Sequence, residues 1–445
     1  MSSTAKYHVP AGTFHVSEKR PLMLQAFLGT CVGLAMHCDA SGVGGIIHLL
    51  LPEPATGLAI SQPEKYATSG VPLFIDALIA AGAHRDSLSA SIAGGALVGP
   101  LSRQDLDLDI GGRTVEVVKK ILKKENIKIV YSETGGFFTC SVNLNMTSGQ
   151  VDIEPAGQNK LCTDEQVRTA TMEEIKASMK LLKPIPQVAL KVMRLLDENK
   201  YDIDPIANEI RKDQVITGRM LQLANSAMFA AKKQITSLDH AIVFLGQDML
   251  VKLVLSAAVR GYYEQSMMGY ALCKGGIYYH ALGCAQVAEM LALKTQREAP
   301  AKAYTAGLLH DIGKVVLDQY VASAYPLFYR DILEEGDNML SIERNRLGMD
   351  HTQVGSLLAQ QWSFPQALED VIRHHHHPHR ASNYADLSAI VYLADLLMSR
   401  FHTGLEIERL ETESLGRYLD ALGLSHQAFG ELVDSIPLTV FLTTD

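Results

Sequence analysis

Two hydrophobic patterns divide this 445-residue chain near residue 155 and restrict each part to a different class of fold. Before that point, short apolar runs such as 22–28 and 32–36 are bounded by glycine and proline, which is typical of strands. Apolar residues spaced three or four apart predict helices at 71–81 and 115–125. From about residue 165 onward, helical spacing continues almost without interruption. The sequence therefore predicts an α/β domain followed by an all-helical domain.

The boundary between these domains is marked by a polar segment that contains proline and glycine. We predict an α/β domain at 1–155, a linker at 156–171 and an all-helical domain at 172–445. The six cysteines include no Cys-x-x-Cys pair, and the first ten residues lack the apolar stretch of a secretory signal. Both observations favour a protein of the reducing cytoplasm.

Charge and hydropathy exclude two classes of partner. The net charge of -9 and the isoelectric point near 6.0 argue against a protein that binds nucleic acid through its phosphates. No apolar run approaches the roughly 18 residues that a membrane span requires. We therefore predict no nucleic-acid partner and no membrane insertion.

Metal-binding residue types recur through the helical half in the order H…HD…H…HH…D. They are His280, His310, Asp311, His351, His375, His376 and Asp395. Imidazole and carboxylate groups in this number can hold two divalent metal ions side by side, and such a pair can activate water and bind a phosphate. Neighbouring helical residues point about 100° apart, so Asp311 can bridge two ions while His310 binds one. The first hypothesis for the chemistry is hydrolysis of a phosphate ester.

The sequence His-Asp-Ile-Gly-Lys at 310–314 resembles the HD-x-G-K signature of the HD-domain superfamily of metal-dependent phosphohydrolases. The resemblance implies one metal held by His280, His310, Asp311 and Asp395, and a second held by Asp311, His351, His375 and His376. It also implies that Lys314 lies near the substrate phosphate and that water activated by both metals is the nucleophile. Ligands of this kind suit iron, manganese, nickel or zinc, so the identity of the metal stays open.

A longer series of motifs resembles the HDOD family, a signalling relative of the HD hydrolases, over about 172–399. The series consists of Leu-Lys-Pro-Ile-Pro at 182–186, Lys-Asp-Gln at 212–214, Leu-Gln-Leu-Ala-Asn-Ser-Ala at 221–227, Ile-Thr-Ser-Leu at 235–238 and Ala-Ile-Val-Phe-Leu-Gly at 241–246. Many HDOD members lack the metal ligands and are non-catalytic scaffolds, whereas this chain keeps the full set. The residues at 378–381 are Pro-His-Arg-Ala rather than the Gly-Tyr-Pro element of cyclic-dinucleotide hydrolases. A scaffold with a structural metal is therefore the alternative to a phosphohydrolase.

The α/β half contains a cysteine and a histidine in neighbouring predicted strands. Cys31 follows a glycine at the end of one strand, and His48 lies inside the next apolar strand. A thiolate paired with an imidazolium is a nucleophile for acyl-transfer reactions. Single cysteines and histidines in strands are more often ordinary core residues, so both interpretations stay open on these residues alone.

The motifs around this pair resemble those of CheD-type chemoreceptor glutamine deamidases over about 7–155. They are Leu-Gly-Thr-Cys-Val at 28–32, Gly-Gly at 44–45 with His48 and Leu-Leu-Pro at 50–52, Ala-Gly-Gly-Ala at 93–96, Ile-Gly-Gly-Arg-Thr-Val at 110–115 and Thr-Gly-Gly at 134–136. The resemblance implies an α/β sandwich in which Cys31 attacks the side-chain amide of a receptor glutamine and His48 is the general base. Two positions depart from the family pattern. Gln25 replaces a threonine, and the segment Phe-Phe-Thr-Cys at 137–140 lacks the expected arginine.

Taken together, the two resemblances imply a cytoplasmic signal-transduction protein with a CheD-like α/β domain and an all-helical HDOD domain. Three functional hypotheses follow: a phosphohydrolase with two divalent metals, a cysteine amidohydrolase that acts on protein glutamine, and a scaffold that binds partner proteins. The implied partners are a phosphate-containing small molecule, signalling proteins and chemoreceptors.

Overall fold

A computed structural model describes most of the backbone of the chain. The described residues are 5–54, 62–96, 109–135, 139–155, 170–197, 207–208, 210–211, 213–225, 235–263, 269–271, 275–323, 328, 339–381, 383–401, 414–437 and 440. The predicted linker at 156–171 lies, up to residue 169, outside the described residues. Parts of three sequence motifs also lie outside the described residues: 136–138 near the Thr-Gly-Gly motif, 212 of the Lys-Asp-Gln motif and 226–227 of the motif at 221–227.

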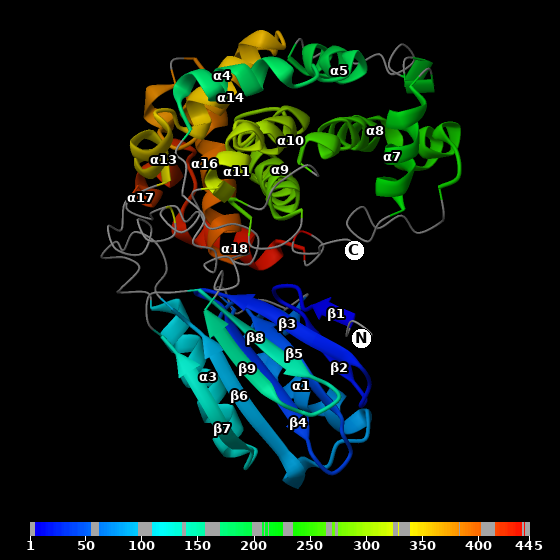
Figure 1. The fold of residues 1–445 in the computed structure, drawn as a ribbon, viewed down its shortest axis with the longest axis vertical. Coiled ribbons are helices and arrows are strands. Elements are labelled where there is room, and N and C mark those ends of the chain that lie inside the picture. Colours follow the sequence, from blue (N-terminus) through cyan, green and yellow to red (C-terminus); the bar gives the residue numbers. More distant parts are fainter. Residues whose placement is uncertain are drawn as a thin grey trace.

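The first part of the chain forms two β-sheets and packs helices against one of them (Figure 1). One sheet has the strand order β1-β3-β8-β9, and the other has the order β2-β5-β4-β6-β7. The strands are β1 (Ala5–His8), β2 (Phe14–Ser17), β3 (Leu22–Leu28), β4 (Val32–Cys38), β5 (Gly44–Leu49), β6 (Leu88–Gly94), β7 (Lys128–Thr134), β8 (Cys140–Asn145) and β9 (Val151–Pro155). The β1–β3 and β6–β7 pairs are parallel, and the other neighbours are antiparallel.

Burial along the strands shows how the layers stack. In β3, buried residues alternate with half-buried ones, so one face packs into the apolar cluster that lies between the two sheets. Strands β4 and β5 are buried along their whole length because α1 (Ala67–Ala80) and α3 (Ile110–Lys124) cover their other face. This arrangement confirms the predicted α/β sandwich.

The two helices of this part begin earlier than the spacing of apolar residues predicts. Helix α1 begins at Ala67 rather than at residue 71, and α3 begins at Ile110 rather than at residue 115. Asp109 caps α3, because its side chain accepts a hydrogen bond of 3.1 Å from the backbone N–H of Gly112. The glycines in the first turn hid this start, since they carry no apolar pattern.

Helices make up almost all of the described structure from residue 170 onward. They are α4 (Met172–Leu181), α5 (Gln187–Asp197), α7 (Gln214–Ala224), α8 (Leu238–Tyr263), α9 (Gly276–Thr295), α10 (Pro300–Leu309), α11 (Lys314–Ser323), α13 (Met339–Leu347), α14 (His351–Gln361), α15 (Gln366–His374), α16 (Ala385–Phe401), α17 (Leu415–Ala421) and α18 (His426–Ser435), with the short 3₁₀ helix η4 (Pro378–Arg380). The predicted all-helical domain is therefore confirmed.

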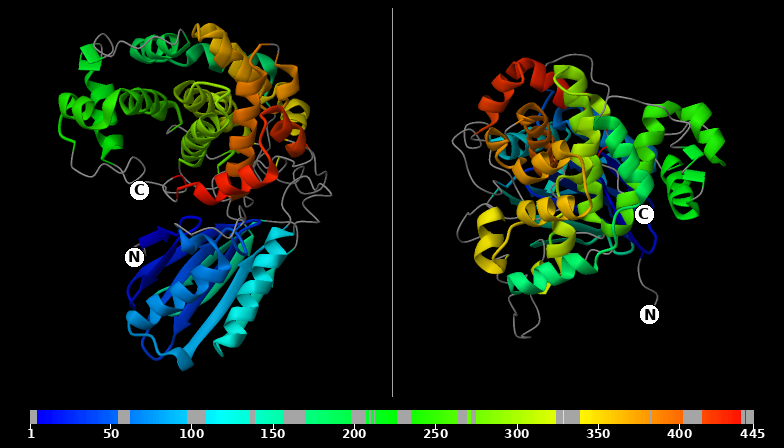
Figure 2. Two further views of the ribbon diagram at one scale, coloured as in Figure 1. Left: turned by 180° about the vertical axis from the view of Figure 1, so that it is seen from behind. Right: turned by 90° about the horizontal axis from the view of Figure 1, so that it is seen from above.

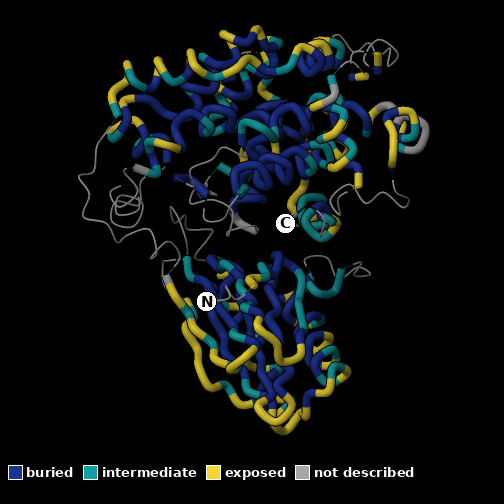
Figure 3. Tube along the Cα trace, turned by 45° about the vertical axis from the view of Figure 1, so that its right-hand side comes forward, coloured by how far each residue is buried: buried dark blue, intermediate teal, exposed yellow. Residues whose placement is uncertain are grey.

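Helix α9 lies at the centre of the helical part and packs against α10 and α16. Most of its residues are buried, and Figure 3 shows the buried segments concentrated around this group of helices. Across the described residues, no helix is both long and apolar enough to cross a membrane.

The helical part meets the strand-rich part just after α18, which lies at the end of the sheets in Figures 1 and 2. The hydroxyl of Tyr66 donates a 2.7 Å hydrogen bond to Oδ1 of Asp434. The ammonium group of Lys65 donates to the backbone carbonyls of Asp434 and Ile436. The contact between the two parts therefore includes polar bonds as well as apolar packing.

Candidate metal centre and candidate cysteine site

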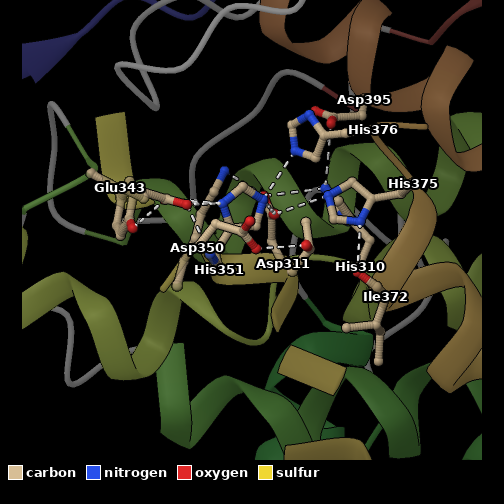
Figure 4. A network of polar contacts seen from close by, with 12 residues as sticks. His310, Asp311, Glu343, Asp350, His351, Ile372, His375, His376 and Asp395 are labelled. Atoms are coloured by element: carbon tan, nitrogen blue, oxygen red, sulfur yellow. Dashed lines mark hydrogen bonds and ion pairs between the residues drawn. The ribbon is translucent and has the colours of Figure 1, made fainter. Parts of the chain in front are cut away.

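Five helices bring the predicted metal ligands together in the helical part (Figure 4). His280 lies on α9, His310 and Asp311 lie in the turn that follows α10, His351 begins α14, His375 and His376 follow α15, and Asp395 lies on α16. The packing of α9 against α10 and α16 closes one side of the group, and the packing of α14 against α15 closes the other. The structure thus places all seven residues around one point.

Asp311 occupies the centre of this group, and each of its two carboxylate oxygens faces a different set of residues. Oδ2 lies 3.2 Å from Nε2 of His310 and 2.6 Å from Nζ of Lys314. Oδ1 lies 3.4 Å from Nε2 of His351 and 3.6 Å from Nε2 of His375. A carboxylate placed in this way can bridge two cations.

The first set of donors lies on the Oδ2 side of Asp311. Nε2 of His280 is 3.0 Å from Oδ1 of Asp395, and Nε2 of His310 is 3.9 Å from Oδ2 of the same residue. Sγ of Cys284 adds a fourth donor, 3.4 Å from Nε2 of His280. The donor atoms of these four residues lie within 4.8 Å of one another, which is close enough to surround one cation.

The second set of donors lies on the Oδ1 side and contains only histidines. Nε2 of His351 and Nε2 of His376 are 3.0 Å apart, and His375 belongs to the same group. Two imidazole nitrogens that bind one ion at about 2.1 Å, at a right angle, would be separated by about 3.0 Å. The geometry therefore fits two ligands of a shared cation.

Hydrogen bonds on the far side of three rings orient them toward the centre. Nδ1 of His310 lies 2.7 Å from the carbonyl oxygen of Gly307, and Nδ1 of His375 lies 3.0 Å from that of Ile372. Because a carbonyl only accepts, each Nδ1 must donate, and the neutral ring keeps the lone pair on Nε2. Nδ1 of His351 makes the same kind of bond, at 2.9 Å, to the buried carboxylate of Glu343. Such outer hydrogen bonds are typical of histidines that bind metals.

Several polar atoms at the centre are buried without a directed hydrogen bond. Among the described side chains these include Nε2 of His310, Nε2 of His375 and Oδ1 of Asp311. Buried polar atoms are normally satisfied, because an unmet donor or acceptor is costly. Acceptors that converge on a common point are satisfied together by a cation, so the residues present fit a metal centre.

The electrostatics of the centre also favour positive charge. Burial alone would lower the pKa of His310, but the neighbouring carboxylates of Asp311 and Asp395 outweigh it and raise this pKa to about 9. Burial lowers the pKa of His375 and lowers that of His376 well below its usual value, so both rings are neutral acceptors. The charges of His310 and Lys314 hold the pKa of Asp311 well below its usual value despite burial.

Lys314 is buried and directed at Asp311 rather than at an open cavity. The expectation that Lys314 lies near a substrate phosphate stays a prediction. Its 2.6 Å contact with Oδ2 fixes the orientation of the carboxylate, so in this structure it acts on Asp311.

A cavity of about 130 Å³ opens beside the second set of histidines. Its lining includes His376 of the metal centre together with Arg344, Arg373 and Arg380. These arginines come from three elements, since Arg344 lies on α13, Arg373 on α15 and Arg380 on η4. The metal centre therefore lies next to a space with concentrated positive charge.

The candidate cysteine site lies at the end of β4 and β5 that faces the helical part. Gly33 of β4 pairs with His48 of β5 in the antiparallel register, and Cys31 directly precedes β4. Side chains two residues apart on a strand lie on the same face, so Cys31 and His48 occupy diagonal positions on one face. Gly33, opposite His48, has no side chain to separate them.

The backbone of Cys31 is held by the Ala-Gly-Gly-Ala motif. The carbonyl oxygen of Cys31 accepts a 2.8 Å hydrogen bond from Gly95 N–H, and Gly94 has a φ of +88°. A Cβ on Gly94 would lie 2.3 Å from that carbonyl oxygen. Only glycine allows both the backbone conformation and this close approach.

His48 is buried, and its ring is oriented by the first strands. Nδ1 of His48 lies 3.3 Å from the carbonyl oxygen of Val9, whereas Nε2 is buried and makes no hydrogen bond to a described residue. Burial lowers the pKa of His48 to about 3, so the ring is neutral at physiological pH and Nε2 carries a lone pair that can accept a hydrogen bond. Gln25, which replaces the threonine of the family pattern, donates instead to Oδ1 of Asn143 at 2.7 Å.

Two family models match this chain. Residues 182–378 match the HDOD domain, and residues 50–155 match CheD chemotactic sensory transduction. The "Probable chemoreceptor glutamine deamidase CheD" of Clostridium tetani is 32% identical to this chain over 152 residues, which cover 92% of that protein and 34% of this chain. The protein of the same name from Symbiobacterium thermophilum is 33% identical over 162 residues, which cover 98% of it and 36% of this chain.

The chain belongs to the CheD family. Its helical half is an HDOD domain. Among solved structures, an HDOD domain protein with unknown function from Geobacter sulfurreducens is 27% identical, with a TM-score of 0.48 and coverage of 59% of this chain and 86% of that one. Cys31 and His48 precede the segment that the CheD model matches, and Asp395 follows the segment that the HDOD model matches.

The HDOD domain contains residues at its centre that the sequence analysis did not identify. Cys284 stands four residues after His280, a spacing that places both on one face of a helix, so this signal was available in the sequence. Glu343 carries no such signal, because it meets His351 only through the packing of α13 against α14. The three arginines likewise come together only in the folded chain.

Proposed function

We propose that the HDOD domain is a metal-dependent hydrolase of phosphate esters. The observation that carries this proposal is the position of Asp311, whose two carboxylate oxygens each face a separate group of buried donor atoms. A single structural ion needs one such group, whereas two groups joined by one carboxylate suit a pair of ions.

Each residue has a distinct part in this proposal. His280, His310 and Asp395 serve the Oδ2 side of Asp311, and the three histidines at 351, 375 and 376 serve the Oδ1 side. Lys314 is a positioning residue, because its contact with Oδ2 holds the carboxylate that both sides share. Divalent ions in the site would supply an activated water and positive charge for the phosphate.

The test combines metal analysis with an assay of phosphate release. Protein purified without chelators is expected to contain about two ions per chain and to release phosphate from at least one ester in a broad panel. The variant Asp311→Asn keeps the shape of the side chain and is expected to lose both properties. Turnover that persists unchanged in this variant would overturn the proposal. Two bound ions without turnover on any ester would favour the scaffold with a structural metal.

A second candidate function, in the CheD region, is hydrolysis of a protein glutamine side chain. It is favoured by the diagonal placement of Cys31 and His48 on one sheet face and by the buried Nε2 of His48, which makes no hydrogen bond to a described residue. In this reaction Nε2 of His48 takes the thiol proton, and Sγ of Cys31 bonds to the amide carbon. Ammonia leaves with that proton. Water then cleaves the thioester, which gives glutamate and restores the thiol.

This second function would make chemoreceptors the partners of the CheD region and would give the whole chain a role in signal transduction. A receptor peptide that contains glutamine is incubated with the protein, and ammonia release and glutamate formation are measured. We expect both in the wild type and neither in Cys31→Ala. Equal ammonia release by the two proteins would refute the assignment of Cys31.

A further inference from the structure

The arginine-lined cavity beside the metal centre has an excess of positive charge. Three guanidinium groups and the carboxylate of Asp350 line it, which leaves two net positive charges. Asp350 is already engaged, because Oδ2 accepts from Arg344 at 2.6 Å and Oδ1 accepts from the hydroxyl of Thr352 at 2.7 Å. In the described part of the chain, neither Arg373 nor Arg380 forms an ion pair with a carboxylate. Two guanidinium groups are therefore available for an anion.

The position and size of the cavity restrict that anion. His376 lines the cavity and also belongs to the second group of metal donors, so an anion in the cavity lies next to one of the proposed metal ligands. A volume of about 130 Å³ accommodates a phosphate group but not the base and sugar of a nucleotide as well. The organic part of such a ligand must extend out of the cavity.

We propose that this cavity binds the scissile phosphate of a phosphate monoester, with Arg373 and Arg380 on its oxygens. The inference rests on the proposed phosphohydrolase function and names its substrate class. A monoester phosphate is close to a dianion at neutral pH and matches the two net charges, whereas a diester carries one negative charge. Hydrolysis adds water to phosphorus, breaks the ester P–O bond and releases the alcohol and inorganic phosphate.

The kinetic test compares p-nitrophenyl phosphate with bis(p-nitrophenyl) phosphate on the metal-loaded full chain. We expect a higher kcat/KM for the monoester. The double variant Arg373→Gln/Arg380→Gln is expected to raise the KM for the monoester about tenfold or more and to change that for the diester much less. Arg417→Gln, which removes an exposed arginine of α17 outside the cavity, is the matched control and should change neither value.

A binding measurement separates this inference from the proposed function. Inorganic phosphate is titrated calorimetrically into the metal-free full chain and into the same two variants, the double variant and Arg417→Gln. Binding that weakens about tenfold in the double variant supports the cavity even if no ester is hydrolysed. Turnover that persists while the double variant changes neither the monoester KM nor phosphate binding would refute the role of the cavity. The proposed phosphohydrolase function would then still stand.

A different observation concerns access to Cys31. The Cys31 side chain is 1% exposed, and it belongs with Ala11 and Leu50 to the same continuous apolar cluster as Ile436 and Val440 of the helical half. The hydrogen bonds from Lys65 and Tyr66 hold the segment after α18 at this place, since Leu50 N–H donates to the carbonyl of Lys65 at 2.9 Å. A side chain that is only 1% exposed is not open to a glutamine of another protein.

We infer that the segment Asp434–Pro437 at the end of α18 closes the cysteine site, so that Cys31 becomes accessible only when this segment moves away. The closure joins the two halves of the chain, because the segment that covers the CheD region is continuous with α18 of the helical half. Displacement breaks the bonds of Lys65 and Tyr66 and exposes the thiol without any change in the strands that carry it.

The rate of alkylation of Cys31 by iodoacetamide, followed by peptide mapping, tests the closure in the full chain. Ile436→Lys places a second ammonium group beside Lys65, and we expect it to speed the labelling of Cys31 at least about tenfold. Cys284, buried in the helical half, reports on unfolding and should remain unlabelled. Glu431→Gln, a change on α18 itself, removes a surface ion pair with Lys294 of α9 and should leave the rate unchanged.

If Ile436→Lys also exposes Cys284, that variant has unfolded the helical half, and the milder variant Tyr66→Phe tests the closure instead. It removes only the hydrogen bond to Asp434, and we expect a smaller increase in labelling of Cys31, about threefold, with Cys284 still protected. Labelling of Cys31 in the wild type as fast as in the denatured protein would overturn the inference. Rates that are identical in the wild type and in Tyr66→Phe would also contradict it.

Discussion

The metal centre and the cysteine site both bury polar atoms, but those atoms are surrounded differently. At the metal centre, unsatisfied nitrogens and a carboxylate oxygen from several helices point at one another, and the group borders an arginine-lined cavity. At the cysteine site, Nε2 of His48 makes no hydrogen bond to a described residue, and it lies near a contact between two parts of the chain. Convergent acceptors indicate a cation, whereas one acceptor beside a covered thiol indicates a site that must be opened.

The largest effect is expected at Asp311, because both groups of donors depend on it. Asp311→Asn should reduce the metal content from about two ions to less than one and lower any phosphohydrolase rate by about 100-fold or more. Metal content is measured by mass spectrometry of the purified protein, and the rate is measured by phosphate release.

The same variant tests whether the two sites are separate. Asp311→Asn should not change the alkylation rate of Cys31, and Cys31→Ala should not change the metal content. Asp420→Asn, an exposed carboxylate on α17, is the matched control for Asp311. A metal-free Asp420→Asn protein, or loss of metal in Cys31→Ala, would contradict the distinction between the sites.

The next largest effect is expected at Glu343, which contacts the ring of His351 and acts on the metal centre through that ring. Glu343→Gln keeps the size of the side chain but removes the charge that holds Nδ1–H of His351 at 2.9 Å. We expect metal affinity on the Oδ1 side to fall about 10-fold to 100-fold, with the other side retained. A competitive titration with a metal indicator would show one weakened site. Equal weakening of both sites would refute the role assigned to Glu343.

Two glycines test how much the close packing around Cys31 contributes to the free energy of unfolding. Gly94 and Gly82 both have positive φ, at +88° and +100°, but only a Cβ on Gly94 meets the carbonyl oxygen of Cys31. Gly82→Ala should lower the free energy of unfolding by about 1 kcal/mol from backbone strain alone. Gly94→Ala should lower it by about 3 kcal/mol. Chemical denaturation measures both, and equal losses would show that the close approach to Cys31 does not matter.

The last expected effect is a dependence of metal binding on pH. The carboxylates of Asp311 and Asp395 raise the pKa of His310 to about 9 despite burial, so without metal this ring is protonated below pH 9. Because a metal requires the lone pair of Nε2, binding must release a proton, and affinity should fall about tenfold per unit as the pH drops below 9. Calorimetry with Mn²⁺ in buffers of different ionisation enthalpy measures this proton. Binding without proton release at pH 7.5 would contradict the ligand role of His310.

The sequence was sufficient for the two fold classes because the hydrophobic periods of the two halves differ. It was less accurate for helix starts, since α3 begins among glycines and is fixed by the capping side chain of Asp109. Lys314 shows a second limit: the short motif identifies the residue, but its 2.6 Å contact with Asp311 is seen only in the folded chain.

The same contrast between what the sequence predicts and what only the folded chain shows applies to the candidate sites. Ligand types in sequence order were enough to nominate the seven residues at the metal centre. Glu343, the arginines of the cavity and the covering of Cys31 depend on contacts between segments that are distant in the sequence, and no local pattern encodes them. Cys284 was readable from its spacing to His280 but lies outside the ligand types of the HD pattern.

The most direct test of the central claim is anomalous diffraction at the manganese edge from a crystal of the full chain grown with Mn²⁺. We predict two anomalous peaks, each at about 2.0–2.2 Å from a different carboxylate oxygen of Asp311. One peak would be surrounded by His280, His310 and Asp395, and the other by the histidines at 351, 375 and 376. Ordered manganese bound elsewhere, with no peak at either oxygen of Asp311, would contradict the account.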